Sequence, residues 1–173
     1  MIIFINGSIN SGKSTVAKIL VEKIPNTAHI EVDDLRHFIT WMPLEESISI
    51  NLENTVSIIK NFSKHNLNSI VTYPLSQNNY DLLMNELKDL NEKIFVFTLN
   101  PDLEVASKDR GERKLDDWER ERIKYHYGSF QHSCSSYQQF DDGACNHRNS
   151  ERPESFINSF AADYNFPCTF LFS

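Results

Sequence analysis

The sequence has no excess of positive charge. Its 17 Lys and Arg residues are outnumbered by 24 Asp and Glu residues, which gives a formal net charge of −7 and a sequence pI near 5.3. Binding to a phosphate backbone or to an anionic bilayer depends on clustered Lys and Arg side chains. We therefore expect neither nucleic acid nor a membrane as the main partner.

Long apolar runs are also missing. No run approaches the roughly 18 residues that a membrane-spanning helix needs. The apolar run at residues 1–5 is too short for the hydrophobic region of a signal peptide, and no basic residues precede it. On these grounds we expect a cytosolic protein.

Cysteine is scarce. The three cysteines, Cys134, Cys145 and Cys168, all lie in the last quarter of the chain, and their odd number argues against a disulfide framework. We interpret them as free thiols. A zinc site would have to pair His132 with Cys134 and Cys145 with His147, and these one-residue spacings are unlike the longer spacings of zinc knuckles.

The remaining features describe one α/β domain over residues 1–173. The length and the 40% hydrophobic content suffice for a single core. Apolar segments that predict strands alternate with segments whose three- and four-residue apolar spacing predicts helices. Such alternation indicates a parallel sheet with helices on both faces, a three-layer fold. The expected strands are residues 2–6, 28–32, 69–73 and 94–99. Four longer helices are expected: one after Lys13, one over about 45–65, one over about 80–90 and one that ends near residue 127.

The C-terminal part of the chain has a less regular pattern. Ser, Gln, Asn and Asp dominate residues 129–150, which predicts a loop or a weakly ordered segment. Residues 153–164 could form a last helix, because Pro153 suits the first turn and Phe156 and Phe160 would share a face. Residues 129–173 as a whole remain poorly defined by the sequence.

The strongest motif is a phosphate-binding loop. Residues 7–14 read Gly-Ser-Ile-Asn-Ser-Gly-Lys-Ser, the full P-loop pattern, placed between a predicted strand and a predicted helix. Its backbone N–H groups and the helix N-terminus would surround phosphate oxygens, Lys13 would reach the β- and γ-phosphates, and Ser14 would bind Mg²⁺. We therefore predict binding of ATP and Mg²⁺ by a set of eight residues: Gly7, Ser8, Asn10, Ser11, Gly12, Lys13, Ser14 and Thr15.

A carboxylate must face Ser14 to complete the metal site. The expected strands 69–73 and 94–99 end without an acid, whereas residues 28–32 are followed by Asp33 and Asp34. We favour Asp33 as metal ligand and as the base that accepts a hydroxyl proton, because neighbours in an extended strand point to opposite sides. Asp34 is then assigned to substrate binding, although either acid could instead be an N-cap for the following helix.

Arg36 is a second candidate for substrate binding. Its guanidinium could hold an anionic or hydroxylated substrate, or it could pair with Asp33 or Glu31 on the surface. Both interpretations stay open.

A charge run at about residues 108–116 predicts a lid over the phosphates. Its arginines, Arg110 and Arg113, flank Gly111, a plausible hinge, and their planar guanidinium groups suit the charge of a transferring phosphoryl group. We assign both to catalysis. The alternative is a solvated face in which Asp109 and Glu112 neutralise the cations.

Taken together, these motifs resemble the small-molecule kinases of the P-loop superfamily. That shikimate-kinase-like and adenylate-kinase-like group includes chloramphenicol phosphotransferases and tunicamycin-resistance-type proteins. The resemblance rests on residues 7–14, on residues 32–36 and on Arg110 with Arg113, and it covers roughly residues 1–127.

The resemblance implies a five-stranded parallel sheet of adenylate-kinase type. It also implies that Lys13 and Ser14 contact ATP and metal, that Asp33 lies near the acceptor hydroxyl, and that Arg110 or Arg113 contacts the phosphates. A fifth strand would come after the lid helix, where residues 169–172 are the only apolar run.

The predicted function is transfer of the γ-phosphoryl group of ATP to a hydroxyl of a small molecule, either a metabolite or an antibiotic. A GTPase is disfavoured because neither an Asp-x-x-Gly switch nor an Asn-Lys-x-Asp base-reading motif occurs. Three alternatives stay open: a P-loop NTPase without a small-molecule acceptor, a nucleotide-binding protein without catalysis, and a nucleoside or nucleotide kinase.

Overall fold

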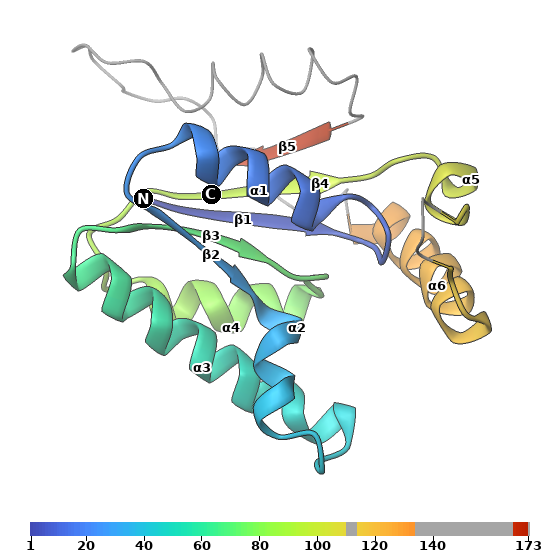
Figure 1. The fold of residues 1–173 in the computed structure, drawn as a ribbon, viewed down its shortest axis with the longest axis horizontal. Helices are drawn as coiled ribbons and strands as arrows, with labels where there is room; N and C mark the ends of the chain where they lie inside the picture. The colour runs from blue at the N-terminus through green and yellow to red at the C-terminus, as the bar shows by residue number, and fades with distance from the viewer. Residues whose placement is uncertain (110–113, 134–167, 173) are drawn as a thin grey trace.

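The computed structural model describes residues 1–109, 114–133 and 168–172 (Figure 1). Three predictions therefore lie outside the described residues: the lid arginines Arg110 and Arg113, the helix at 153–164, and residues 134–150 of the loop predicted at 129–150. Residues 129–133 of that loop are described, and the loop prediction is wrong for them because they belong to the helix Asp117–Ser133. Within the described ranges, no helix has both the length and the apolar character needed to cross a bilayer.

A five-stranded sheet forms the centre of the fold. In spatial order its strands are β2 (Thr27–Glu31), β3 (Asn68–Thr72), β1 (Ile2–Gly7), β4 (Ile94–Leu99) and β5 (Cys168–Phe172). The first four are parallel, and in the central strand Ile3 pairs with Ile70 on one side and with Phe95 on the other. The carboxyl ends of these four strands therefore share one edge of the sheet.

The fifth strand corrects the predicted all-parallel sheet, because β5 runs antiparallel to β4, with Cys168 opposite Leu99. Four strands are parallel, not five. A parallel partner would need a crossover connection back to the amino ends of the strands, whereas an antiparallel partner can enter at the carboxyl end of β4. The apolar run of residues 169–172 could not reveal the direction, since the pattern of a strand reads the same both ways.

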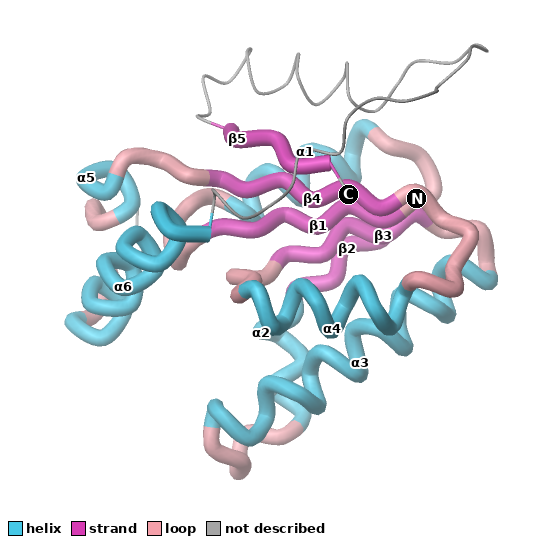
Figure 2. Tube along the Cα trace, turned by 180° about the vertical axis from the view of Figure 1, so that it is seen from behind, coloured by secondary structure: helices cyan, strands magenta, loops and turns pink. Residues whose placement is uncertain are grey.

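Helices cover both faces of the sheet and confirm the three-layer α/β fold. Figures 1 and 2 show α1 (Lys13–Lys23) on one face and α3 (Leu44–Lys64) with α4 (Gln77–Leu87) on the other. Each layer follows from its apolar stripe. On the α1 side, Val16, Ala17 and Leu20 pack on Ile3, Ile5 and Ile70, and on the other side α3 contributes Leu52, Val56 and Ile59.

Three short helices and the longer α6 gather at the carboxyl ends of the strands. The short ones are α2 (Val32–Leu35), a 3₁₀ helix (Arg36–Phe38) and α5 (Leu103–Ala106), and α6 covers Asp117–Ser133 (Figure 1). Ala106, Leu115 and Ile123 form a small buried cluster against Ile9 of the phosphate loop. This packing brings α6 to the edge where the predicted site lies.

One boundary differs from the predicted one in a way that affects the site. The strand expected at residues 28–32 ends at Glu31, and Val32 begins α2 as a buried residue. Asp33 and Asp34 therefore lie in the first turn of a helix, and Glu31 is the last residue of the strand. The apolar side chain of Val32 made the strand look one residue longer in the sequence.

Candidate active site

The loop between β1 and α1 has the backbone of a phosphate-binding loop. Gly7 and Gly12 have φ values of 150° and 97°, and Asn10 adopts a left-handed conformation with φ of 60°. A Cβ atom at Gly7 would lie 2.5 Å from Ser11 Oγ and 2.7 Å from the Leu99 carbonyl oxygen. Only glycine fits there, because the backbone approaches β4 too closely for any side chain.

Asn6 anchors the start of this loop to its neighbours. Its Oδ1 accepts hydrogen bonds from Gly7 N at 2.7 Å and from Leu75 N at 2.8 Å, and its Nδ2 donates to Thr98 Oγ1 at 3.2 Å. The side chain is buried, so each of these bonds fixes the loop at the carboxyl ends of three strands. The sequence interpretation did not single out Asn6, although a polar residue before Gly7 in an apolar strand was a usable signal.

The residues around the start of α1 suit an anion. The Lys13 ammonium group donates to the Gly7 and Ser8 carbonyl oxygens at 3.0 and 2.8 Å, which holds it inside the loop. Helix α1 has no side-chain cap and no acidic residue in its own first turn, so none of its first-turn residues neutralises its positive end. The buried Ser11 hydroxyl has no hydrogen-bond partner in the described part of the chain. These groups fit a phosphate ligand.

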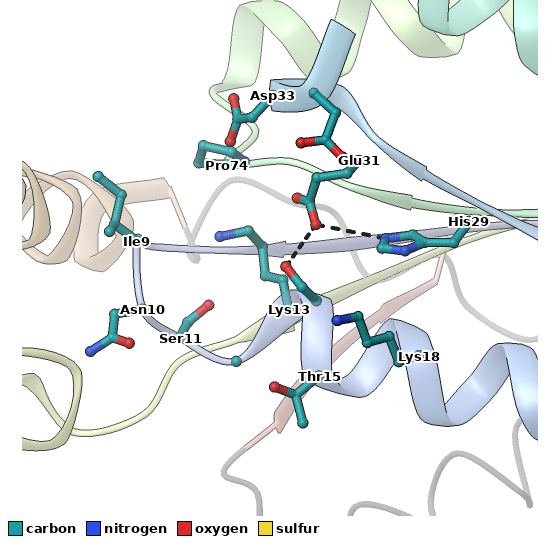
Figure 3. Close-up of a pocket in the computed structure, with 13 residues that line it drawn as sticks. Ile9, Asn10, Ser11, Lys13, Thr15, Lys18, His29, Glu31, Asp33 and Pro74 are labelled. Atoms are coloured by element: carbon teal, nitrogen blue, oxygen red, sulfur yellow. Dashed lines mark hydrogen bonds and ion pairs between the residues drawn. The ribbon is translucent and has the colours of Figure 1, made fainter. Parts of the chain in front are cut away.

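The carboxylate that faces Ser14 belongs to Glu31. Ser14 Oγ donates to Glu31 Oε2 at 2.7 Å, and the same oxygen lies 3.9 Å from His29 Nε2 (Figure 3). His29 Nε2 also lies 2.9 Å from Thr72 Oγ1. Burial lowers the pKa of His29, against the opposing effect of Glu31. A neutral imidazole leaves the Glu31 charge available to a cation.

These side chains line one cavity of about 650 Å³. Lys13, Lys18 and three carboxylates, Glu31, Asp33 and Asp34, contribute its charge, and Pro74 also lines it. Figure 3 shows Asp33 beside Pro74, with the Lys13 ammonium group directed between the loop and the carboxylates of Glu31 and Asp33. The Asp33 residue is exposed, yet the protein packed around its carboxyl group raises its pKa, and Lys13 opposes that rise.

The structure brings most of the predicted site residues together. Arg36 does not line the cavity. Gly7 and Ser8 do not line it either, but their carbonyl oxygens accept the hydrogen bonds that hold the Lys13 ammonium group. The individual roles assigned from the sequence stay predictions. The predicted site residues that line the cavity are Asn10, Ser11, Gly12, Lys13, Ser14, Thr15, Asp33 and Asp34.

Glu31 and His29 were missed by the sequence interpretation. It took Asp33 as the first acid after the strand, because the strand was expected to continue through Val32. Strand parity offered the missing signal: Glu31 and His29 are two residues apart, so they lie on the same face of β2.

A further contact joins the loop to the segment before α6. Asn10 Nδ2 donates to the carbonyl oxygens of Ala106 at 2.8 Å and of Lys108 at 2.9 Å. From the other side, Arg120 donates to Ser107 O at 2.7 Å and to Asp109 Oδ1 at 2.8 Å. Residues 106–109, where the predicted lid begins, are thus held between the phosphate loop and α6.

Comparisons with known proteins place the fold. No family model matches the chain, and no curated protein matches its sequence. The structure resembles a chain of the Pnkp1/Rnl/Hen1 RNA repair complex, with a TM-score of 0.60 and 14% identity, over 88% of this chain and 52% of that one. This protein therefore spans about half the length of that chain.

Two other solved structures are similar over most of their own length. The tunicamycin resistance protein of Deinococcus radiodurans matches with a TM-score of 0.57 and 17% identity, over 98% of this chain and 97% of that one. A gluconokinase from Sinorhizobium meliloti 1021 matches with a TM-score of 0.53 and 16% identity, over 72% and 73% of the two chains. At these identities the likeness concerns architecture, and the chain has the fold of the P-loop kinases.

Proposed function

We propose that this protein is an ATP- and Mg²⁺-dependent phosphotransferase that moves the γ-phosphoryl group to a hydroxyl of a small molecule. One observation carries the proposal: the cavity combines a phosphate loop holding Lys13, a Ser14 hydroxyl bonded to Glu31, and a separate carboxylate, Asp33. A protein that only binds nucleotide does not need the additional acid. The kinase fold of the similar structures is consistent with the proposal.

The chain's own residues account for each part of the transfer. Lys13, the loop N–H groups and the N-terminus of α1 bind and orient the triphosphate. The acceptor oxygen forms a bond to the γ-phosphorus while the bond from phosphorus to the β–γ bridging oxygen breaks, and ADP leaves. Asp33 accepts the hydroxyl proton, and its raised pKa makes it a stronger base than an aspartate with the usual pKa.

Ser14 and Glu31 are the residues that would hold Mg²⁺. A hydroxyl and a carboxylate are oxygen ligands of the kind that this ion prefers, and Lys13 sits where the bound phosphates must lie. When bound, Mg²⁺ neutralises phosphate charge during transfer. Asp33 was assigned to the metal from the sequence, and it remains the alternative ligand because it lines the same cavity.

The test is ADP release measured with Mg²⁺ and ATP, alone and with a panel of hydroxylated metabolites, sugar acids, nucleosides and hydroxylated antibiotics. We expect turnover that depends on one acceptor class, with a product heavier by one phosphoryl group. Lys13→Ala should abolish it. Nucleotide binding without stimulation by any acceptor would instead favour an NTPase or a nucleotide sensor.

A further inference from the structure

His29 lines the cavity, and the transfer steps proposed above assign it no role. Its Nε2 atom lies 3.9 Å from Glu31 Oε2, the same oxygen that accepts the hydrogen bond from Ser14 (Figure 3). At this distance the contact between His29 and Glu31 is electrostatic and is not a hydrogen bond. Both side chains are only 20% exposed, so water screens the contact only partly.

The pairing of strands β2 and β3 places these groups on one face of the sheet. His29 and Glu31 are alternate residues of β2, so their side chains point to the same side, and Glu31 is paired in register with Thr72 of β3. Ile70, the register partner of His29, packs against the apolar residues of α1. The face that carries His29 is therefore the face covered by α1, the helix that carries Ser14.

The hydrogen bonds of Thr72 indicate which ring nitrogen of His29 carries a proton. Thr72 Oγ1 lies 2.9 Å from His29 Nε2 and donates to the Ile30 carbonyl oxygen at 3.5 Å. A hydroxyl has one proton, so a hydroxyl that donates to Ile30 must accept from His29. The reverse arrangement would turn the lone pair of Nε2 toward the negative Glu31 oxygen, which is unfavourable. The contacts therefore favour a proton on Nε2.

A proton on Nε2 lies close to both Thr72 and Glu31. The positive end of this N–H dipole attracts Glu31 Oε2 and favours the orientation in which that oxygen meets Ser14. Thr72 is fully buried, so its hydroxyl is a fixed support for the ring. Lys18 also lines the cavity, but it is exposed and forms no ion pair with Glu31 in the described part of the chain.

We propose that His29, itself held by Thr72, is a positioning residue that orients the Glu31 carboxylate for Mg²⁺ through its Nε2–H group. The inference rests on the proposed function, which assigns Ser14 and Glu31 to the metal, and it adds an outer pair of residues to that site. Groups that support a metal ligand from behind keep it in its binding orientation, and their loss weakens metal affinity. A residue that only packed the sheet would change stability and leave the Mg²⁺ requirement unaltered.

Variants of His29 separate the Nε2–H donor from the bulk of the ring. The side-chain amide of Gln reaches the position of Nε2, whereas the shorter amide of Asn reaches only that of Nδ1, so His29→Gln retains the donor and His29→Asn loses it. Thr72→Val removes the hydroxyl at nearly constant shape. Two matched controls lie on α3 or at its end: His65→Ala at an exposed histidine, and Thr55→Val, which removes a buried hydroxyl bonded to Asn51 O.

The measurement is calorimetric binding of a non-hydrolysable ATP analogue over a series of Mg²⁺ concentrations. We expect His29→Asn and Thr72→Val to raise the half-saturating Mg²⁺ concentration by about 3- to 10-fold, the size of one hydrogen-bond contribution. His29→Gln and both controls should stay near wild type, and binding without Mg²⁺ should not change. An unaltered Mg²⁺ requirement in His29→Asn, or an equal rise in His29→Gln, would overturn the proposal.

The metal-free protein gives a second test, which needs neither nucleotide nor turnover. Long-range NMR correlations of the histidine ring nitrogens identify the nitrogen that carries the proton, and the His29 signals are assigned by their loss in His29→Gln. At a pH where the ring is neutral we expect the proton on Nε2. A proton on Nδ1 alone would contradict the proposed contact with Glu31.

These readouts distinguish the positioning role from the proposed function. If no acceptor is phosphorylated but His29→Asn and Thr72→Val raise the Mg²⁺ requirement as expected, the positioning role stands and the phosphotransferase function falls. If transfer is found and His29→Asn keeps the wild-type Mg²⁺ requirement, only the positioning role falls. Analogue binding by wild type that does not depend on Mg²⁺ would overturn the metal site and the positioning role together.

Discussion

At the scale of single residues, two carboxylates in one cavity have different surroundings. Glu31 accepts a hydrogen bond from Ser14 and faces the start of α1, whereas Asp33 lies beside Pro74 with a raised pKa. The protein packed around the Asp33 carboxyl group disfavours its ionised form, and Lys13 opposes that effect. In the proposed mechanism, Glu31 is therefore the metal ligand and Asp33 is the base.

The first prediction concerns Asp33→Asn. We expect nucleotide binding to persist and transfer to fall by about 10²- to 10⁴-fold, the usual contribution of a positioned base. Calorimetric titration with an ATP analogue and acceptor-dependent turnover measure the two effects. Normal transfer by this variant would show that Asp33 is not the base. Asp89→Asn, at an exposed position outside the cavity lining, is the control for a general charge effect.

The raised pKa of Asp33 also gives a stability prediction. A carboxyl group whose folded pKa lies above its unfolded value stabilises the fold while both states are protonated, and this stability is lost as pH rises through the folded pKa. At neutral pH the ionised carboxylate of Asp33 destabilises the folded state, so Asp33→Asn should have a slightly higher melting temperature than wild type. The difference should vanish at acid pH, and a lower melting temperature at pH 7 would contradict this reasoning.

Glu31→Gln should weaken the binding of Mg²⁺ more than it weakens the binding of nucleotide itself. The amide keeps a hydrogen-bond acceptor for Ser14 but removes the negative charge that favours a divalent cation. We expect the Mg²⁺ concentration for half-maximal nucleotide binding to rise by about tenfold, as for other substitutions around metal ligands. Glu22→Gln, an exposed position on α1, controls for net charge. Equal Mg²⁺ dependence of both variants would exclude Glu31 from the metal site.

At the scale of elements, the phosphate loop is fixed by close backbone packing. Gly7→Ala would place a Cβ atom 2.7 Å from the Leu99 carbonyl oxygen, so β1 and β4 would have to separate. Overpacking of this kind costs about 1–3 kcal/mol. We expect a lower melting temperature and weaker ATP binding, and unchanged values of both would show that the loop is not held as described.

The contact between Asn10 and residues 106–109 gives another prediction. Asn10→Gly keeps the left-handed backbone but removes the side chain that donates to Ala106 O and Lys108 O. Each lost hydrogen bond costs about 1 kcal/mol, so amides of α5 should exchange hydrogen faster with little change in β1. Asn10→Ala adds backbone strain and should cost more. Equal exchange in α5 for wild type and Asn10→Gly would contradict the proposed contact.

The elements that the sequence predicted well are those with long apolar stripes. Helix α3 and strand β4 were expected at about 45–65 and 94–99 and lie at Leu44–Lys64 and Ile94–Leu99. Helix α5 was not expected, since four residues are too few to show a helical period. The predicted end of strand β2 was wrong by one residue, because the buried Val32 suits both a strand end and a helix start.

At the scale of the whole molecule, the architecture followed from the alternation of strands and helices, and the site followed from the P-loop pattern. Local spacing could not reveal which distant side chains meet. Thr72 approaches His29 because β2 and β3 pair side by side, and Asn10 meets Lys108 across 98 positions of sequence. The direction of β5 was hidden for the same reason, since it depends on the path of the chain and not on residue pattern.

The proposed function requires that the γ-phosphoryl group pass to a carbon-bound hydroxyl. The decisive measurement follows the labelled phosphoryl group of γ-labelled ATP in the presence of Mg²⁺ and each acceptor. We expect the label to appear in an organic phosphate ester with wild type, and in no product with Lys13→Ala. Label recovered only as inorganic phosphate, at a rate that no acceptor changes, would contradict the claim and identify a hydrolase.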